Sequence, residues 1–225
     1  MWFTSATSTL IKKIKEKIRS IYIYKSLSRF DNSGVTIISQ NCIGGMWYHD
    51  LQERFNSPTI NLFIPPPDFI KFCQKLEYYK EIELVECSEI ESLEYARNLK
   101  FHWNRTFPIA KCGDIVLFGV HYSSFLELKD KWHSRFKRVN AQNIRLIMVE
   151  RDGCTFNDLY NFDRLPYKKV CFTSRQYKEI LSCVVLPNSR VNESFHKVTD
   201  LTSFTSFFSA KRFYDSWDFV DFLNK

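Results

Sequence analysis

Short apolar runs alternate with stretches of helical spacing along most of the chain. The runs are rich in β-branched and aromatic residues, which is typical of strands, and the stretches between them repeat apolar positions every three or four residues, which is typical of helices. We predict strands at residues 35–38, 59–64, 82–85, 107–111, 115–120, 144–149, 170–173 and 180–186. We predict helices at residues 47–55, 68–80, 92–99, 124–139, 155–165 and 207–223, with the last one aromatic and packed on the outside.

This alternation predicts the class and the layering of the fold. Consecutive parallel strands need a crossover connection, and a helix is the usual one. We therefore expect an α/β fold of three layers, with a mostly parallel or mixed sheet, helices on both faces and a Rossmann-like arrangement. Turn residues at 31–34 mark where this domain begins, so residues 31–225 are predicted to form a single α/β domain.

Residues 1–30 follow a different pattern. Apolar side chains recur at positions 10, 11, 14, 18 and 21 with lysines between them, which predicts a basic amphipathic helix. It lacks the unbroken apolar core of a signal peptide and is too charged to span a bilayer. Two interpretations stay open: a peripheral anchor on anionic lipid, or a helix packed on the domain through its isoleucine stripe.

The charge is concentrated in that same segment. Residues 1–30 carry seven Lys and Arg against one Glu, so they hold +6 of the net charge of +7. The body of the protein is almost neutral, and we do not expect it to bind nucleic acid. An anionic membrane surface is the partner that this distribution favours, on the inner face of the plasma membrane.

The seven cysteines indicate a reducing compartment. Their number is odd and no CxxC pair is present, which argues against a disulfide framework and against a zinc knuckle. Most of them lie inside apolar runs, where Cys behaves as a small buried hydrophobe. We expect a cytoplasmic protein.

Polar residues follow three of the predicted strands, at Asn41-Cys42, His121-Tyr122 and Arg151-Asp152-Gly153. The carboxyl ends of parallel strands share one edge of a sheet, where α/β proteins bind ligands. We therefore expect these three segments to meet at a single site.

Each candidate residue has a functional and a structural interpretation. Cys42, before a helix, is a candidate nucleophile or a buried thiol. His121 is a candidate general base or phosphate donor, or a histidine satisfied by nearby backbone. Asp152 orients a base or binds a divalent ion through a substrate phosphate, or it belongs to an ordinary turn. Gly44-Gly45 lets the backbone approach a ligand, or simply forms a turn.

Two further groups are candidates for substrate binding. Tyr48 lies on the first turn of the predicted helix after the glycines, where one face meets the cleft. Arg135 and Arg138 share a helix face with Lys131, beside Trp132. Planar guanidinium groups in a row suit phosphate or carboxylate recognition, although a solvated basic face is the common alternative.

Several blocks of sequence resemble a known family in the same order: SQNCIGGMWYHDL, FNSPTINLFI, FPIAKCGDIVLFGVHY, KWHSRFKRVN and VERDGCTFNDLYNFDRLPYKKVCFT. They are similar to the bacterial family called domain of unknown function 1919, whose members are commonly labelled exopolysaccharide or capsule biosynthesis proteins. The resemblance covers residues 35–186 and implies a surface-polysaccharide pathway. The family's blocks fall on Asn41, Cys42, Gly44, Gly45, Tyr48, Asn61, Asp114, His121, Tyr122, Trp132, Arg135, Arg138, Asn140, Arg151, Asp152 and Gly153. Relatives often have Ser-Asn-Asn-Cys where this chain has Ser39-Gln40-Asn41-Cys42, a mild departure that leaves the loop intact.

The resulting hypothesis is a transferase that acts on an activated sugar or a lipid-linked glycan at the cytoplasmic membrane face. His121 or Asp152 would be the base, and the arginines would bind phosphates. The Asp-x-Asp metal motif of many glycosyltransferases is absent, so no cofactor is predicted; a divalent metal and the transfer of an acyl, pyruvyl or phosphate-linked group stay open. The alternative is a non-catalytic carbohydrate- or nucleotide-binding accessory protein.

Overall fold

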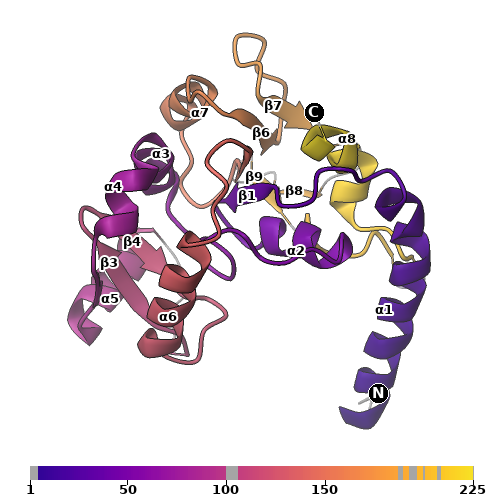
Figure 1. The fold of residues 1–225 in the computed structure, drawn as a ribbon, viewed down its shortest axis with the longest axis horizontal. Helices are drawn as coiled ribbons and strands as arrows, with labels where there is room; N and C mark the ends of the chain where they lie inside the picture. The colour runs from indigo at the N-terminus through magenta and orange to yellow at the C-terminus, as the bar shows by residue number, and fades with distance from the viewer. Residues whose placement is uncertain are drawn as a thin grey trace.

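The chain is organised around a parallel sheet whose central strands are buried (Figure 1). The computed structural model describes residues 5–99, 106–186, 190–192, 197–199, 201–206 and 209–224. In spatial order, the sheet consists of β1 (Thr36–Ser39), β5 (Ile144–Val149), β6 (Lys168–Thr173) and β7 (Cys183–Val185), and every neighbouring pair is parallel. The predicted α/β class is confirmed. Strands buried on both faces are expected to be continuous apolar runs, and β5 has that pattern from Leu146 to Val149.

Each face of the parallel sheet has its own hydrophobic core. Successive residues of β5 point to opposite faces, so Leu146 and Met148 join one core while Ile147 and Val149 join the other. Helices contribute to both cores, and the predicted three layers are confirmed. The first core takes residues from α3 (Pro66–Gln74), α6 (Phe125–Phe136) and α7 (Phe156–Asp163). The second takes residues from α1 (Ser5–Leu27), α2 (Ile43–Asp50) and α8 (Phe219–Asn224).

Three of the predicted strands form a separate antiparallel sheet. Its order is β2 (Leu84–Glu86), β3 (Ile109–Cys112) and β4 (Ile115–Phe118). The one mostly parallel or mixed sheet that we predict is therefore two sheets, and these apolar runs form the antiparallel one. The physical reason is the connection between β3 and β4, a tight turn at Gly113 with φ of +60°, which is too short for the crossover that a parallel pair needs.

The predicted strand at 59–64 is also wrong, yet the segment has a clear structural role. Asn61 has φ of +66°, which interrupts any extended strand, and the segment makes only an isolated bridge between Phe63 and Phe118. The neighbouring Ile64 N–H donates to the carbonyl of Gln40 at 2.9 Å. Because Gln40 follows β1 and Phe118 ends β4, this segment joins the two sheets side by side.

The helices follow their local signals, with shifted boundaries. α2 begins at Ile43, four residues before the predicted start. The predicted helix at 68–80 is two helices, α3 and α4 (Leu76–Glu81), separated at Lys75. α7 begins after Thr155, as predicted, with a capping box between Thr155 and Asp158, and α5 (Glu89–Asn98) has a capping box at Ser88. α6 is capped by Ser124, whereas the Glu127 carboxylate accepts from the backbone N–H of Ser123.

The aromatic C-terminal segment lies in the core. Instead of one helix over 207–223, there is a short 3₁₀ helix η1 (Phe213–Ser216) followed by α8; residues 207–208 lie outside the described residues. Phe219 stacks on Trp47 with ring centroids 5.0 Å apart. Packing on the outside is therefore wrong, because these aromatic rings complete the second core. A small antiparallel pair, β8 (Arg190–Asn192) and β9 (Lys197–Thr199), precedes this segment.

The N-terminal helix α1 is attached to the body by a buried ion-pair network. Arg19 is 5% exposed; its Nε donates to Asp50 at 2.9 Å and its Nη1 donates to Asp215 at 2.8 Å. Ile23 is buried beside it, whereas Ile18 and Ile21 are exposed. The helix is therefore packed on the domain, but through Arg19 and Ile23 and not through Ile14, Ile18 or Ile21. Among the residues that the structure describes, no helix has both the length and the apolar content needed to cross a membrane.

Candidate functional site

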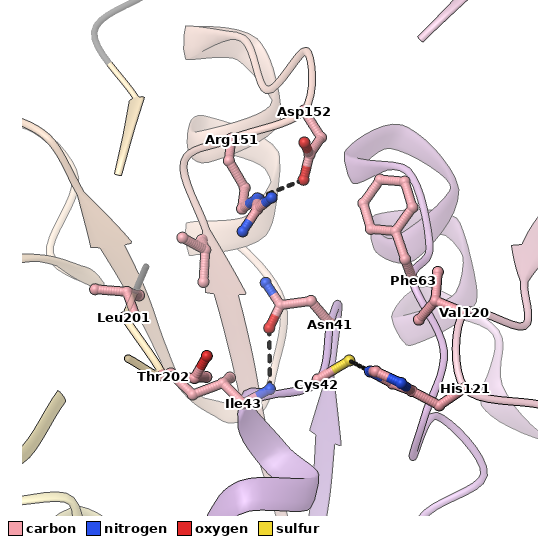
Figure 2. Close-up of a pocket in the computed structure, with 11 residues that line it drawn as sticks. Asn41, Cys42, Ile43, Phe63, Val120, His121, Arg151, Asp152, Leu201 and Thr202 are labelled. Carbon is pink, nitrogen blue, oxygen red and sulfur yellow. Dashed lines mark hydrogen bonds and ion pairs between the residues drawn. The ribbon is translucent and has the colours of Figure 1, made fainter. Parts of the chain in front are cut away.

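A pocket of about 270 Å³ lies where the two sheets meet (Figure 2). Its walls come from the chain after β1, the loop after β4, the loop after β5 and a segment near the C-terminus. The lining residues are Asn41, Cys42, Ile43, Phe63, Val120, His121, Val149, Arg151, Asp152, Leu201 and Thr202. The three polar segments expected to converge, around Cys42, His121 and Asp152, all line this pocket. The topology that brings them together differs from the predicted one, because His121 follows a strand of the antiparallel sheet.

The central feature of the pocket is a contact between a thiol and an imidazole. Cys42 Sγ lies 3.1 Å from His121 Nε2. Cys42 is the N-cap residue of α2, and its side chain makes no capping hydrogen bond, so the sulfur is directed to the histidine. Developing negative charge on this sulfur is favoured by the positive end of the helix dipole. A nucleophile and a base within hydrogen-bond distance form the basic unit of covalent catalysis.

The environment of Cys42 keeps the thiol neutral at rest. Burial raises the pKa of the Cys42 thiol to about 11, against the opposing effect of the Arg151 charge. At neutral pH the sulfur therefore carries its proton until a base removes it. His121 is exposed and in contact with that sulfur, which suits the role of the base.

Hydrogen bonds before and after His121 fix the loop that carries it. The backbone N–H of Gly119 donates to the carbonyl of Pro108, and the backbone N–H of Tyr122 donates to the carbonyl of Gly119. The Tyr122 hydroxyl donates to the carbonyl of Ile60 at 2.7 Å. These bonds on both sides of His121 fix its position opposite Cys42.

Arg151 and Asp152 form the opposite wall of the pocket. Arg151 Nε donates to Asp152 Oδ2 at 2.6 Å, so the carboxylate positions the guanidinium and not the imidazole. Asp152 has φ of +54° and Gly153 has φ of +86°, a left-handed turn that folds the chain back over the pocket. This ion pair favours a role for Asp152 in positioning Arg151 over the predicted role in orienting the base.

Asn41 presents an amide donor to the same space. Its Oδ1 accepts from the backbone N–H of Ile43 at 3.1 Å, which assigns the Nδ2 group to the pocket side. Together with the Arg151 guanidinium and the Thr202 hydroxyl, it makes the wall facing the thiol rich in hydrogen-bond donors. Such a wall suits an anionic or strongly polar substrate group.

The glycines and Tyr48 lie outside the pocket lining. A Cβ on Gly44 would lie 2.7 Å from Ser39 Cβ, so this glycine allows α2 to pack closely on β1. A Cβ on Gly45 would meet Ile60 at an ordinary 3.5 Å. Tyr48 is fully buried, and its hydroxyl accepts from Ile37 N–H and donates to the Val35 carbonyl. The contacts of Gly44 and Tyr48 are structural.

In the predicted basic row, Lys131 is exposed, whereas Arg135 in α6 and Arg138 just after it bind backbone carbonyls. Arg135 Nη1 donates to the Ile60 carbonyl at 3.0 Å and to the Tyr122 hydroxyl at 2.6 Å. Arg138 donates twice to the Phe55 carbonyl. We call Tyr122, Arg135 and Arg138 the loop anchor, because all three bind carbonyls of residues 55–60. Trp132, 1% exposed, packs in the core beside them. None of these four side chains lines the pocket: Tyr122, Arg135 and Arg138 donate to backbone carbonyls, and Trp132 packs against Phe72 and Phe136.

Some pocket residues escaped prediction from sequence. Phe63 lay in a segment predicted to be a buried strand, and Leu201 and Thr202 come from a stretch with no motif and no periodic pattern. Only the folded chain brings residues 201–202 next to residues 41–43. Within the part of the chain that the structure describes, no group of three or more His, Cys, Asp or Glu side chains is arranged to hold a metal ion.

Comparison with known proteins identifies the family of this chain. Residues 12–224 match the family model described as Domain of unknown function (DUF1919). A protein of Haemophilus influenzae, described as an uncharacterized protein, is 32% identical over 216 residues, which cover 95% of this chain and 96% of the relative. The chain therefore belongs to the DUF1919 family.

Proposed function

We propose that this protein is a group-transfer enzyme in which Cys42 is the nucleophile and His121 is the general base. The observation that carries the proposal is the 3.1 Å contact between Cys42 Sγ and His121 Nε2 at a pocket. The chemistry of a thiol favours transfer of an acyl group over transfer of a sugar, because sulfur attacks a carbonyl carbon readily and forms a thioester. The surface-polysaccharide pathway implied by the resemblance supplies a plausible acceptor, a hydroxyl of a glycan.

The reaction takes two steps that balance on these residues. His121 Nε2 removes the thiol proton as Cys42 Sγ bonds to the acyl carbon, and the bond from that carbon to the donor's leaving group breaks. The imidazolium returns its proton to the leaving group. His121 then removes the proton of the acceptor hydroxyl, whose oxygen bonds to the acyl carbon of the thioester. The bond from that carbon to Cys42 Sγ breaks, and the imidazolium gives its proton to the sulfur, which restores the thiol.

The other pocket residues position the donor. The Arg151 guanidinium, oriented by Asp152, and the Asn41 amide bind a negatively charged part of it, such as the phosphate of an activated carrier. Binding energy from that remote group holds the acyl carbon near the sulfur.

Trapping of the thioester tests the proposal. The protein is incubated with an activated acyl thioester and analysed by intact-mass and peptide mass spectrometry. We expect one acyl group on Cys42, its loss in Cys42→Ala, and much slower formation in His121→Asn. Cys154→Ser is the matched control, since Cys154 is also a half-buried cysteine outside any disulfide, and its replacement should leave labelling unchanged. Equal labelling of Cys154, or full labelling of His121→Asn, would refute the assigned roles.

A non-catalytic accessory protein is the second candidate, and one observation favours it. A thiol with its pKa raised to about 11 is unreactive unless a base activates it. A binding module would bind an anionic sugar derivative in the same pocket equally well in Cys42→Ala and in the unaltered protein, and it would form no thioester.

A further inference from the structure

Helix α1 has two faces of opposite character, and only one of them is used inside the molecule. The inner face carries Arg19 and Ile23, which are 5% and 3% exposed. Arg19 is saturated by Asp50, Asp215 and the Tyr214 hydroxyl, so the orientation of the helix about its axis is determined. Figure 1 shows α1 leaving the body toward its N-terminus as a rod.

The outer face is apolar and open to solvent. Its large side chains are Ile14, Ile18, Ile21 and Tyr24, which are 49%, 47%, 70% and 69% exposed. Their spacing of three or four residues places them on one side of the helix, opposite Arg19. We call these four residues the outer stripe. Exposed Lys17 and Lys25 lie on the same side of the helix, between these apolar side chains. An exposed helix face that combines large apolar and basic side chains is typical of an interaction site.

The charges beside the outer stripe select the partner. Lys17 and Lys25 are exposed on the outer half of α1, among the apolar side chains, whereas Arg19 and Arg29 are already paired with aspartates of the body. An anionic surface complements the exposed lysines, because it attracts basic side chains beside a membrane. A second copy of the chain fits less well, because pairing two outer stripes would bring two strongly basic segments together.

We propose that the outer stripe docks α1 lengthwise on an anionic lipid bilayer. Ile14, Ile18, Ile21 and Tyr24 enter the boundary between headgroups and acyl chains, and the flanking lysines meet the lipid phosphates. Because the buried ion pairs of Arg19 fix α1 to the body, the body takes a defined orientation relative to the membrane. The proposal rests on α1 alone and is independent of the reaction proposed for the pocket.

Vesicle co-sedimentation of the full chain tests the proposal. We compare vesicles of phosphatidylcholine alone with vesicles that also contain phosphatidylglycerol. Binding is expected only with the anionic lipid, and it should weaken as salt rises because the lysines are exposed. The triple variant Ile14→Ser, Ile18→Ser, Ile21→Ser should lose about tenfold or more in vesicle affinity, since three inserted side chains are replaced by polar ones.

A matched control triple replaces exposed apolar residues elsewhere: Ile90→Ser, Leu126→Ser and Leu181→Ser, which are 79%, 66% and 90% exposed in the unaltered protein. It should bind vesicles like the unaltered protein, and both triples should keep its melting temperature. The proposal is overturned by failure of the unaltered protein to bind anionic vesicles, by equal binding to phosphatidylcholine alone, or by equal losses in both triples. Light scattering that shows a dimer dissolved by the stripe variant would assign the face to a second copy instead.

Discussion

The loop anchor and the pocket contain similar polar residues, but they differ in whether the hydrogen-bonding groups of those residues are already occupied. The loop anchor of Tyr122, Arg135 and Arg138 is occupied by the backbone carbonyls of residues 55–60. At the pocket, Cys42 and His121 contact each other while Arg151 and Asn41 face open space. Both clusters contain the residue types that recognise phosphate, and His121 even adjoins Tyr122. The difference teaches that the role of a polar side chain follows from whether its hydrogen-bonding capacity is already used.

The largest expected effect lies at the pocket. Cys42→Ala should lower acyl transfer by about a thousandfold or more, because a nucleophile acts in every turnover and no other pocket residue replaces it. Its melting temperature should stay close to that of the unaltered protein, since the thiol makes no capping bond. Steady-state kinetics and thermal melting measure these two effects. Residual activity of Cys42→Ala within tenfold of the unaltered protein would contradict the assignment of Cys42 as the nucleophile.

The loop anchor should respond in the opposite way, through stability. Arg135→Met keeps the apolar stem and removes the donors to Ile60 and Tyr122, which should cost about 2 to 3 kcal/mol of unfolding free energy. Lys131→Met, at an exposed position of the same helix, is the control and should change stability by about 0.5 kcal/mol or less. Urea denaturation measures both. If Arg135→Met is stable but binds substrate poorly, the loop anchor belongs to the site after all.

The pH dependence of Cys42 alkylation tests whether the Cys42 thiol is protonated at neutral pH. Because burial raises its pKa from about 9 to about 11, the folded protein at pH 7 should react with iodoacetamide about a hundredfold more slowly at Cys42 than the denatured chain does. The rate should rise with pH and level off only near pH 11. A plateau near neutral pH would indicate a preformed thiolate and remove the need for His121 as base.

Gly44 separates packing from ligand binding at the start of α2, with the smallest expected effect. Gly44→Ala should destabilise the fold by about 1 to 3 kcal/mol because its Cβ would collide with Ser39. Gly45→Ala, one residue on, meets only ordinary contacts and should stay within about 1 kcal/mol of the unaltered protein. Denaturation midpoints compare the pair. A stable Gly44→Ala that loses substrate binding would show that this glycine serves the ligand.

Much of the local structure was determined by the sequence alone. The apolar run of β5, the helix start at Thr155 and the polar residues after the strands at 41–42, 121 and 151–152 are local signals, and each lies where it was predicted. Apolar runs identify strands because burial of a pleated ribbon requires them, wherever the partner strands come from.

Only the tertiary structure decided which strands pair and which polar groups remain available. An apolar run does not distinguish β4, in an antiparallel sheet, from β5, in a parallel one, because partner choice depends on distant residues and on connection length. Nothing local separates Arg135, held by the Ile60 carbonyl, from Arg151, which faces the pocket. Burial and hydrogen-bond partners are properties of the assembled chain, and they distinguish the candidate site from its supporting structure.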